Sequence, residues 1–546
     1  MPLLRSDVAK VPTGAWWGAG LVTVIAVGAF LRLYRLDEAP GWYGDEFVHL
    51  DLARNLASFD PRVGGFRVDW FGTIAHPPLF FLIGSVVTSL FGDSIGALRL
   101  VPALSGTLSI ALLYRAGTLL RSRAMGLLAA AAYAVFPIAV MLDRRAYSYS
   151  LVLPFALGVI VCMLRFLERR EQRFLYTGAF LLSLLLVTGH FTAPMLVVFL
   201  VFSAVYDRVR LPRYAALALS CPVLFSLVFL LPRWETALFS IGWELGRARW
   251  STSGLVDLLR RNIALASRDA ALVIAAFGVL FARGAGVAWC MLVFLSVSQF
   301  LIYRRPDIAG LDYPAGAFLG FFALPFAAFF LGVRDLGLRA ADRWLRPGLH
   351  RAAAVGAMTL VTLGAPVLLL ASNLAAIAPA VWHARIATPV DRWSEVRSEV
   401  LAARAFLAKE VGPQQLVAGS PVITGSVRGS WTDLMQSFVY ETGRGTLFYP
   451  AYAHDMPDYR AKVFAFDCSI EQVDFLVLSL IDWKRNLRMP FAQLLLQTDE
   501  QRLSSERAAQ EAKSDGAPQF LTIRGRPWQV VFRIGSIVVL RNPHAG

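Results

Sequence analysis

The stretch GWYGDEFVHL, residues 41–50, carries two adjacent carboxylates, Asp45 and Glu46, and the histidine His49. Asp45 and His49 are four residues apart, so on a helix their side chains would lie on one face and could share a metal ion such as Mg²⁺ or Mn²⁺. One carboxylate and one imidazole are an incomplete ligand set, because protein metal sites commonly supply three or four ligands. The pair therefore indicates a candidate divalent-cation site that needs further ligands from elsewhere in the chain.

The carboxylates follow an apolar run, residues 14–34, that is long enough to cross a bilayer. Charged groups at the rim of a hydrophobic bundle are costly unless they face water, pair with another charge or bind a ligand. We expect further polar residues on the same face of the membrane: His76, Asp143, Arg144, Arg145, Tyr147, His190, Arg304, Arg305, Asp312 and Tyr313. For Glu46, Asp312 and most of these arginines, ion pairing or anchoring at the membrane interface is the alternative to a role in chemistry.

The elements that must position these residues are membrane helices. Of the 546 residues, 56% are apolar and 17% are charged, with a mean hydropathy of +0.55, so the chain is a polytopic membrane protein and not a soluble one. The net charge of +15 is concentrated in short loops between apolar runs, which favours lipid headgroups over nucleic acid as the anionic partner. The four cysteines form neither a disulfide framework nor a metal-knuckle spacing. Residues 14–34 are expected to be a retained anchor helix.

Hydropathy predicts about eleven transmembrane helices. The predicted spans are 14–34, 98–120, 124–143, 147–167, 174–189, 191–206, 214–231, 270–282, 286–303, 313–333 and 352–378. With a cytoplasmic N-terminus, four basic loops fall inside: the loop with Arg121 and Arg123, and the loops 168–173, 207–213 and 334–351. Asp45 and Glu46 then lie outside.

The apolar segment 77–92 could also cross the membrane, but it would then place the basic loops outside. We therefore expect it to be a helix at the membrane surface or packed on the bundle, within a first outer loop of residues 35–97. Residues 232–269 form a second large outer loop that could cover a site.

The C-terminal part has short alternating apolar runs in place of membrane-length blocks. We divide the chain into a transmembrane domain, residues 1–379, and an α/β domain on the outer side, residues 380–546. The expected strands are 415–420, 446–450, 473–480 and those within 528–542, and the expected helix is 393–411. Residues 499–518 are polar and are expected to be an exposed helix or loop.

Four quoted segments resemble a known family. GDEFVHLDLARNL (44–56), residues 75–120 beginning AHPPLFF, FPIAVMLDRRAYSYSL (136–151) and TGHFT (188–192) are similar to segments of the GT-C membrane glycosyltransferases of the protein O-mannosyltransferase and aminoarabinose transferase type. The resemblance covers about residues 15–330. It implies a polyprenyl-phosphate-linked sugar donor, inverting transfer to a lipid, glycan or protein acceptor, and a site on the outer face of a bacterial inner membrane, with a role in the cell envelope.

The resemblance also implies roles for individual residues. Asp45 would be the catalytic base that takes the acceptor proton, with Glu46 catalytic beside it or supporting it. Cations are needed where the phosphate leaves, and the candidates are Arg145, Arg304 and Arg305. The candidate substrate-binding residues are His76, Asp143, Tyr147 and His190. His76 could instead order the loop before its two prolines, and His190 could instead be a packing residue.

Two other classes of protein remain compatible with many spans. A secondary transporter should show related halves and broken helices near the membrane midplane, whereas here the acidic and basic residues cluster at one face and no related halves are visible. A flippase or polymer-assembly scaffold would need no base at Asp45. Activity of an Asp45→Asn protein therefore separates both classes from an enzyme.

Overall fold

The computed structural model describes most of the membrane bundle and part of the C-terminal region. The described residues are 14–39, 46, 49–50, 53, 78–92, 94–189, 192–231, 238, 270–281, 320–344, 348–382, 397–410, 415, 417–419, 474–479, 520–523, 526–535 and 537–544. The statements below on structure concern these residues.

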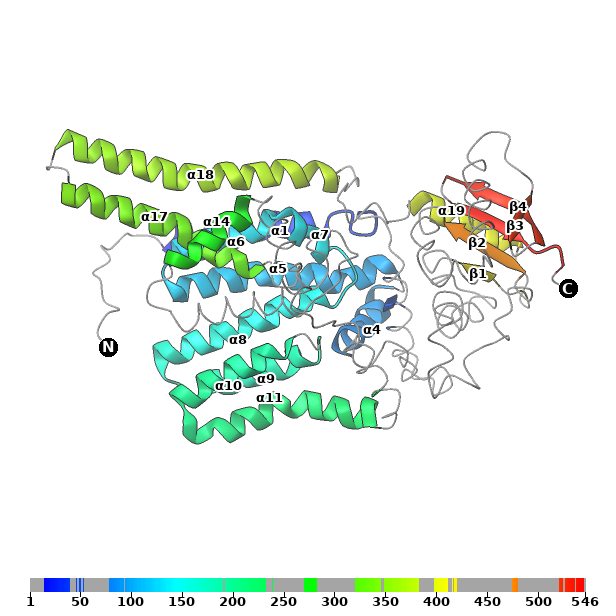
Figure 1. The fold of residues 1–546 in the computed structure, drawn as a ribbon, viewed down its shortest axis with the longest axis horizontal. Helices are drawn as coiled ribbons and strands as arrows, with labels where there is room; N and C mark the ends of the chain where they lie inside the picture. The colour runs from blue at the N-terminus through cyan, green and yellow to red at the C-terminus, as the bar shows by residue number, and fades with distance from the viewer. Residues whose placement is uncertain are drawn as a thin grey trace, which may run out of the picture.

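Long apolar helices lie side by side in a bundle (Figure 1). The helices are α1 (Gly14–Leu33), α4 (Leu79–Phe91), α5 (Ile95–Leu120), α6 (Arg123–Val135), α7 (Pro137–Asp143), α8 (Tyr149–Arg169), α9 (Arg173–Leu186), α10 (Pro194–Tyr206), α11 (Leu211–Phe225), α14 (Ala270–Gly278), α17 (Ala323–Trp344) and α18 (Leu349–Trp382). Short 3-10 or π turns are η2 (Arg208–Arg210), η3 (Ser226–Leu230), η5 (Val279–Phe281) and η6 (Gly320–Phe322). Helices thus occupy every predicted span except 286–303, which lies outside the described residues.

Six helices in the described part are long and apolar enough to cross a membrane, or seven if the bent pair α6 and α7 is one span. The axes of α6 and α7 differ by 66°, and the break falls at Phe136, just before Pro137. Proline is well tolerated at the first position of a helix but disrupts a helix interior, so Pro137 starts a new helix there. The expected total of eleven spans stays a prediction.

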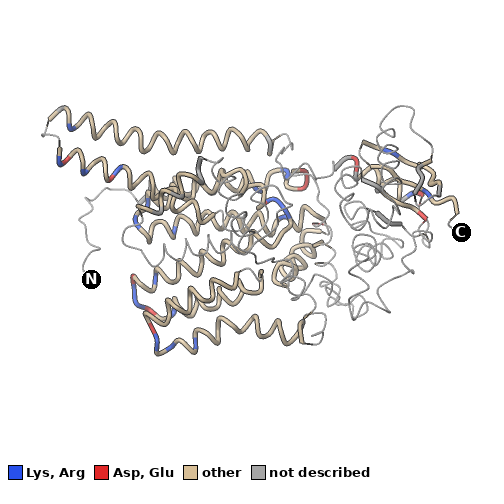
Figure 2. Tube along the Cα trace, in the orientation of Figure 1, with Lys and Arg blue, Asp and Glu red and all other residues tan. Residues whose placement is uncertain are grey.

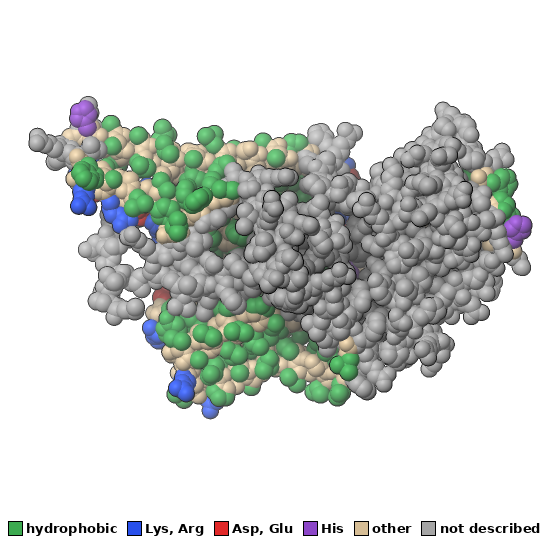
Figure 3. All heavy atoms as spheres, in the orientation of Figure 1, with side chains coloured by type: hydrophobic (Ala, Val, Ile, Leu, Met, Phe, Trp, Pro, Cys, Tyr) green, Lys and Arg blue, Asp and Glu red, His purple; other side chains and the backbone are tan. Residues whose placement is uncertain are grey.

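Small residues allow the backbones of α5 and α6 to approach closely where the two helices pack. A Cβ added at Gly117 would lie 2.7 Å from the Cα of Gly126, so neither position has room for a side chain. Close backbone approach of this kind is the usual packing of membrane helices, which gain little from burying apolar surface against each other. Outward faces of α11 and α18 instead carry exposed apolar side chains, as Leu360 and Val223 show (Figure 3).

The basic loops gather at one end of the bundle, on the left in Figure 2. Arg121, at the end of α5, forms an ion pair with Asp335 of α17. Arg170 lies over the ring of Tyr206, 5.7 Å from its centroid, and so joins the α8–α9 loop to the end of α10. This clustering agrees with the predicted placement of these loops on one side of the membrane.

Helix α4 packs against α5 near the opposite end of the bundle. Phe80 and Phe81 are buried, and a Cβ at Gly84 would lie 2.7 Å from the side chain of Leu98. Its 13 residues reach about 20 Å at 1.5 Å per residue, which is short of the roughly 30 Å hydrocarbon core. The length and packing favour a helix on the bundle over a separate span.

The C-terminal region contains a five-stranded mixed sheet. Its strands are β1 (Val417–Gly419), β2 (Phe475–Ser479), β3 (Phe520–Ile523), β4 (Arg526–Ile534) and β5 (Ile537–Arg541), in the order β1-β2-β5-β4-β3. β1 pairs with β2 in parallel and the other pairs are antiparallel. Helix α19 (Arg397–Glu410) contacts the sheet through Phe406, whose ring stacks on Phe532 at 4.5 Å.

All of these elements except β3 lie at or over the segments where the sequence patterns predict them. α19 falls within the predicted helix, and β1, β2, β4 and β5 fall within or over predicted strand segments, with a turn at Gly535 (φ 52°) between β4 and β5. β3 was not predicted. The predicted strand 446–450 and the polar segment 499–518 lie outside the described residues.

Candidate active site

Five of the residues predicted for the site are described, together with their neighbour Arg144: Glu46, His49, Asp143, Arg145 and Tyr147. Asp45, His76, His190, Arg304, Arg305, Asp312 and Tyr313 lie outside the described residues. The described set converges on one place, where the segment that contains Glu46 and His49 meets the turn between α7 and α8.

Glu46 forms a buried ion pair with Arg99 of α5. Arg99 donates from Nε to Oε1 at 2.8 Å and from Nη2 to Oε2 at 2.6 Å, and both side chains are fully buried. Its Nη1 donates to the carbonyl of Leu36 at 2.9 Å. The guanidinium therefore ties the segment after α1 to the start of α5 with a planar, two-bond contact.

Burial raises the pKa of the Glu46 carboxyl, but the charge and hydrogen bonds of Arg99, the charge of Arg145 and the N–H of Ala146 outweigh it, and the pKa ends below its ordinary value. The carboxyl is therefore ionised at neutral pH. Both of its oxygens already accept hydrogen bonds. A carboxylate held in this way suits the supporting role for Glu46 better than the transfer of a proton.

The backbone N–H and the backbone carbonyl of Ala146 are both bound by side chains from the segment after α1. Its N–H donates to Glu46 Oε1 at 2.8 Å, and its carbonyl accepts from His49 Nδ1 at 2.6 Å. A carbonyl oxygen can only accept, so the proton of the His49 ring is on Nδ1. The His49 ring also meets the rings of Tyr147, Phe80 and Phe81 edge-on, at centroid distances of 5.1–5.8 Å.

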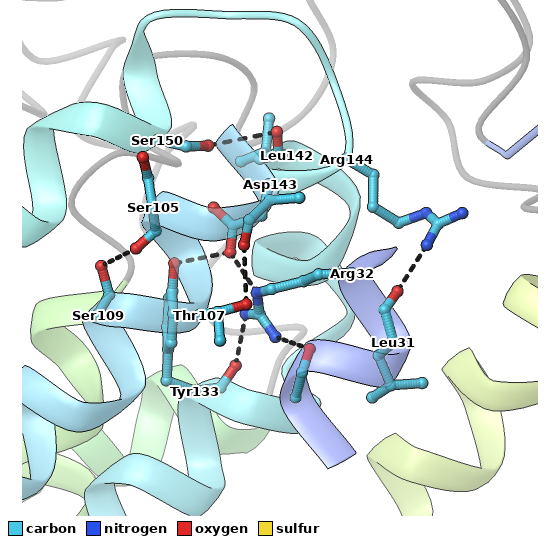
Figure 4. Close-up of polar contacts among 12 residues, drawn as sticks. Leu31, Arg32, Ser105, Thr107, Ser109, Tyr133, Leu142, Asp143, Arg144 and Ser150 are labelled. Carbon is cyan, nitrogen blue, oxygen red and sulfur yellow. Dashed lines mark hydrogen bonds and ion pairs between the residues drawn. The ribbon is translucent and has the colours of Figure 1, made fainter. Parts of the chain in front are cut away.

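Asp143, at the end of α7, is occupied by two donors inside the bundle. Arg32 of α1 donates from Nε to Asp143 Oδ2 at 2.8 Å, and the hydroxyl of Tyr133 donates to the same oxygen at 2.8 Å (Figure 4). Arg32 also donates to the carbonyls of Tyr133 and Ala134 at the end of α6. These contacts stabilise the bend between α6 and α7, and the predicted substrate contact of Asp143 stays a prediction.

Arg144 caps the end of α1. It donates to the carbonyl oxygens of Leu31, Tyr34, Arg35 and Ala39 at 2.7–3.0 Å. The last carbonyls of a helix have no partner inside the helix and carry partial negative charge, so a buried guanidinium satisfies both needs. Arg32 and Arg144 thus each bind carbonyls near the end of a helix other than their own.

Arg145 is fully buried between these anchored residues, and it interacts electrostatically with Glu46. Tyr147 is buried too, with its ring stacked on Tyr149 at 5.9 Å. The roles predicted for both, at the donor phosphate and the substrate, remain proposals.

Sequence reasoning did not identify Arg32, Arg99 and Tyr133. The first two are charged residues within predicted apolar spans. Such residues inside a membrane protein usually pair or line a site, so their type and position could have identified them.

For metal binding, the described His, Cys, Asp and Glu residues contain no group of three that could hold an ion. Nδ1 of His49 is engaged by a carbonyl, an arrangement that is also common in histidines that bind a metal through Nε2. The predicted pair of Asp45 and His49 therefore stays a prediction, because Asp45 lies outside the described residues.

Residues 75–233 match the family model described as dolichyl-phosphate-mannose-protein mannosyltransferase. Among curated proteins, none matches the chain in sequence. Several solved structures share its fold. One is ArnT from Cupriavidus metallidurans bound to undecaprenyl phosphate, with 15% identity and a TM-score of 0.54, covering 98% of this chain and 100% of that one.

The apo form of the same ArnT gives a TM-score of 0.55 at 15% identity, with 97% and 98% of the two chains covered. The archaeal oligosaccharyltransferase AglB from Archaeoglobus fulgidus, in complex with an inhibitory peptide and a dolichol-phosphate, gives 0.51 at 13% identity, with 88% of this chain and 70% of that one covered. The transporter and flippase alternatives find no support in these comparisons. Residues 75–233 thus match the dolichyl-phosphate-mannose-protein mannosyltransferase family model, and the chain shares its fold with the membrane proteins ArnT and AglB.

Proposed function

We propose that the protein transfers a sugar from a polyprenyl-phosphate-linked donor to a lipid, glycan or protein acceptor, with inversion, on the outer face of a bacterial inner membrane. One observation carries the proposal: the segment that follows Asp45 is hydrogen-bonded, through Glu46 and His49, to the turn that contains Arg145. The segment that contains Glu46 and the buried guanidinium of Arg145 therefore lie at the same end of the bundle, away from the basic loops. The ArnT and AglB structures contain undecaprenyl phosphate and dolichol-phosphate, which supports this class of donor.

Asp45 is the proposed base. As the acceptor oxygen attacks the anomeric carbon, the Asp45 carboxylate takes the acceptor proton, and the bond from the sugar to the phosphate oxygen breaks with its electron pair leaving on the phosphate. Arg145, with Arg304 and Arg305, would stabilise that negative charge, since guanidinium groups match phosphate oxygens in shape and charge. Glu46 holds the segment in place through Arg99.

The proposed topology places the site outside. The basic loops lie together at one end of the bundle, and α18 returns the chain to the other end before the C-terminal sheet (Figures 1 and 2). An N-terminus in the cytoplasm, about eleven spans, outer loops at 35–97 and 232–269, and a periplasmic domain at 380–546 fit this arrangement. A divalent cation held by Asp45 and His49, and substrate contacts of His76 and His190, complete the proposal.

Native mass spectrometry of the purified protein tests the donor class. We expect a co-purified mass that corresponds to a polyprenyl phosphate or a polyprenyl phospho-sugar, and we expect added undecaprenyl phosphate to compete it away. Saturation by phospholipids alone, with no shift on addition of undecaprenyl phosphate, would overturn the proposed donor.

A further inference from the structure

We infer that His49 and Glu46 together act as a clamp on the two peptide groups that flank Ala146, and that His49 is a positioning residue for sugar transfer through its Nδ1 atom. The inference rests on the proposed function, because it assigns to the clamp the task of holding Arg145 and Tyr147 relative to Asp45. Nothing in the resemblance or in the comparisons gives His49 this role.

The clamp consists of two hydrogen bonds, one to each of the two peptide groups that flank the Cα of Ala146. Ala146 donates its N–H to Glu46 and accepts from His49 through its carbonyl, at 2.8 and 2.6 Å. Buried backbone groups need partners, and here both partners are buried side chains, three positions apart in the sequence. Because these two peptide groups join Ala146 to Arg145 and to Tyr147, holding both of them fixes the backbone from which those two side chains extend.

Both arms of the clamp are themselves anchored. Glu46 is held by Arg99, which also binds the carbonyl of Leu36. His49, only 3% exposed, is held by the rings of Phe80 and Phe81 at the start of α4. The side chains of Glu46 and His49 therefore cannot change rotamer without breaking buried contacts.

Covalent geometry extends the clamp to the proposed base. Asp45 directly precedes Glu46 in the sequence, and Cα atoms joined by a trans peptide are about 3.8 Å apart. The position of Glu46 therefore limits where Asp45 can lie relative to the Arg145 turn. Catalysis is sensitive to such placement, and a displacement of about 1 Å can lower a rate by about a hundredfold.

Either ring nitrogen of His49, Nδ1 or Nε2, could carry its function, and substitutions can distinguish the two. The side-chain amide nitrogen of asparagine lies as many bonds from Cα as Nδ1 of histidine, whereas that of glutamine reaches as far as Nε2. His49→Asn thus preserves a donor for the Ala146 carbonyl. His49→Gln preserves a polar group where Nε2 would meet a metal or a substrate, and His49→Phe preserves only the ring contacts.

The experiment measures kcat and KM for sugar transfer by the full-length protein in nanodiscs, using a synthetic polyprenyl phospho-sugar. We expect His49→Phe and His49→Gln to lose about tenfold to a hundredfold in kcat, and His49→Asn to recover most of it. Thr362→Val is the matched control, because it also removes a buried side-chain hydrogen bond to a carbonyl, at 2.7 Å, but within α18. It should leave kcat unchanged.

Rescue by glutamine and not by asparagine would overturn the clamp in favour of a metal or substrate role for Nε2. Equal activity of His49→Phe and the parent would overturn any positioning role while leaving the proposed function intact. Absence of transfer by the parent itself, by contrast, would remove the proposed function.

Hydrogen–deuterium exchange of peptides that cover residues 143–149 tests the clamp without activity. Faster exchange is expected in His49→Phe, with protection restored in His49→Asn. Unchanged protection in His49→Phe would contradict the clamp whatever the protein transfers.

Discussion

The ion pair of Glu46 and Arg99 allows a prediction of stability. Arg99→Met removes a guanidinium that is fully buried and that makes two hydrogen bonds to Glu46, at 2.6 and 2.8 Å. The carboxylate would remain buried without the cation that is hydrogen-bonded to it, and breaking such a pair costs about 3 to 5 kcal/mol. We expect the free energy of unfolding, measured by equilibrium titration of detergent-solubilised protein with sodium dodecyl sulfate, to fall by this amount.

Arg165→Met is the matched control. Arg165 forms an ion pair with Glu168 at 2.7 Å, but Glu168 is 53% exposed, so the pair is screened by water and is expected to contribute less than about 1 kcal/mol. The double variant Arg99→Met/Glu46→Leu removes both buried charges, and it should recover most of the lost stability. Equal losses in Arg99→Met and Arg165→Met, or no recovery in the double variant, would refute the reasoning.

Three further predictions concern the same region. Gly106→Ala should destabilise the protein strongly, because its Cβ would overlap the Asp143 carboxylate and lie 2.8 Å from Arg32 Nε. Gly18→Ala should be neutral, because a Cβ there would have no atom within 4 Å. Unfolding titrations of the two variants test this difference. Folding lowers the pKa of the Glu46 carboxyl, so its contribution to stability is complete above the ordinary value of 4.5 and is lost as the pH falls through the folded pKa. The difference in free energy of unfolding between the parent and Glu46→Gln should therefore shrink in that acid range. A difference that stays constant with pH would contradict the lowered pKa. Arg145→Ala should weaken binding of a short-chain polyprenyl phosphate by about 1.5 to 3 kcal/mol. Arg145→Lys should bind with an affinity between those of Arg145→Ala and the parent, since lysine keeps the charge but not the planar guanidinium. Equal affinities of the three proteins in a binding titration would count against a phosphate contact.

Hydropathy was enough to place the helices, because a membrane helix must present about 20 apolar residues in succession. The predicted segments 98–120 and 147–167 correspond to α5 (Ile95–Leu120) and α8 (Tyr149–Arg169), with ends that differ by at most three residues. The bend within 124–143 was not predicted. Pro137 marked the place, but the direction of α7 depends on Arg32, which lies more than a hundred residues earlier in the chain.

The site was predicted in part. The segments of Glu46 and Arg145 were both identified, but the sequence could not show that they bind each other, because the contact joins residues a hundred positions apart through one backbone peptide. The partners Arg99 and Arg32 were missed for the same reason. A single arginine inside an apolar run shows that a partner is needed, but not which residue supplies it.

Sugar transfer by the Asp45→Asn protein tests the proposed mechanism most directly. Asparagine keeps the shape of the side chain but cannot take a proton, so turnover of a polyprenyl phospho-sugar should be abolished while binding of the donor lipid stays nearly as in the parent. The assay measures released polyprenyl phosphate and, in parallel, donor affinity for the parent and the variant in nanodiscs. Turnover by Asp45→Asn equal to that of the parent would contradict the account, because the acceptor proton would then be taken by another group.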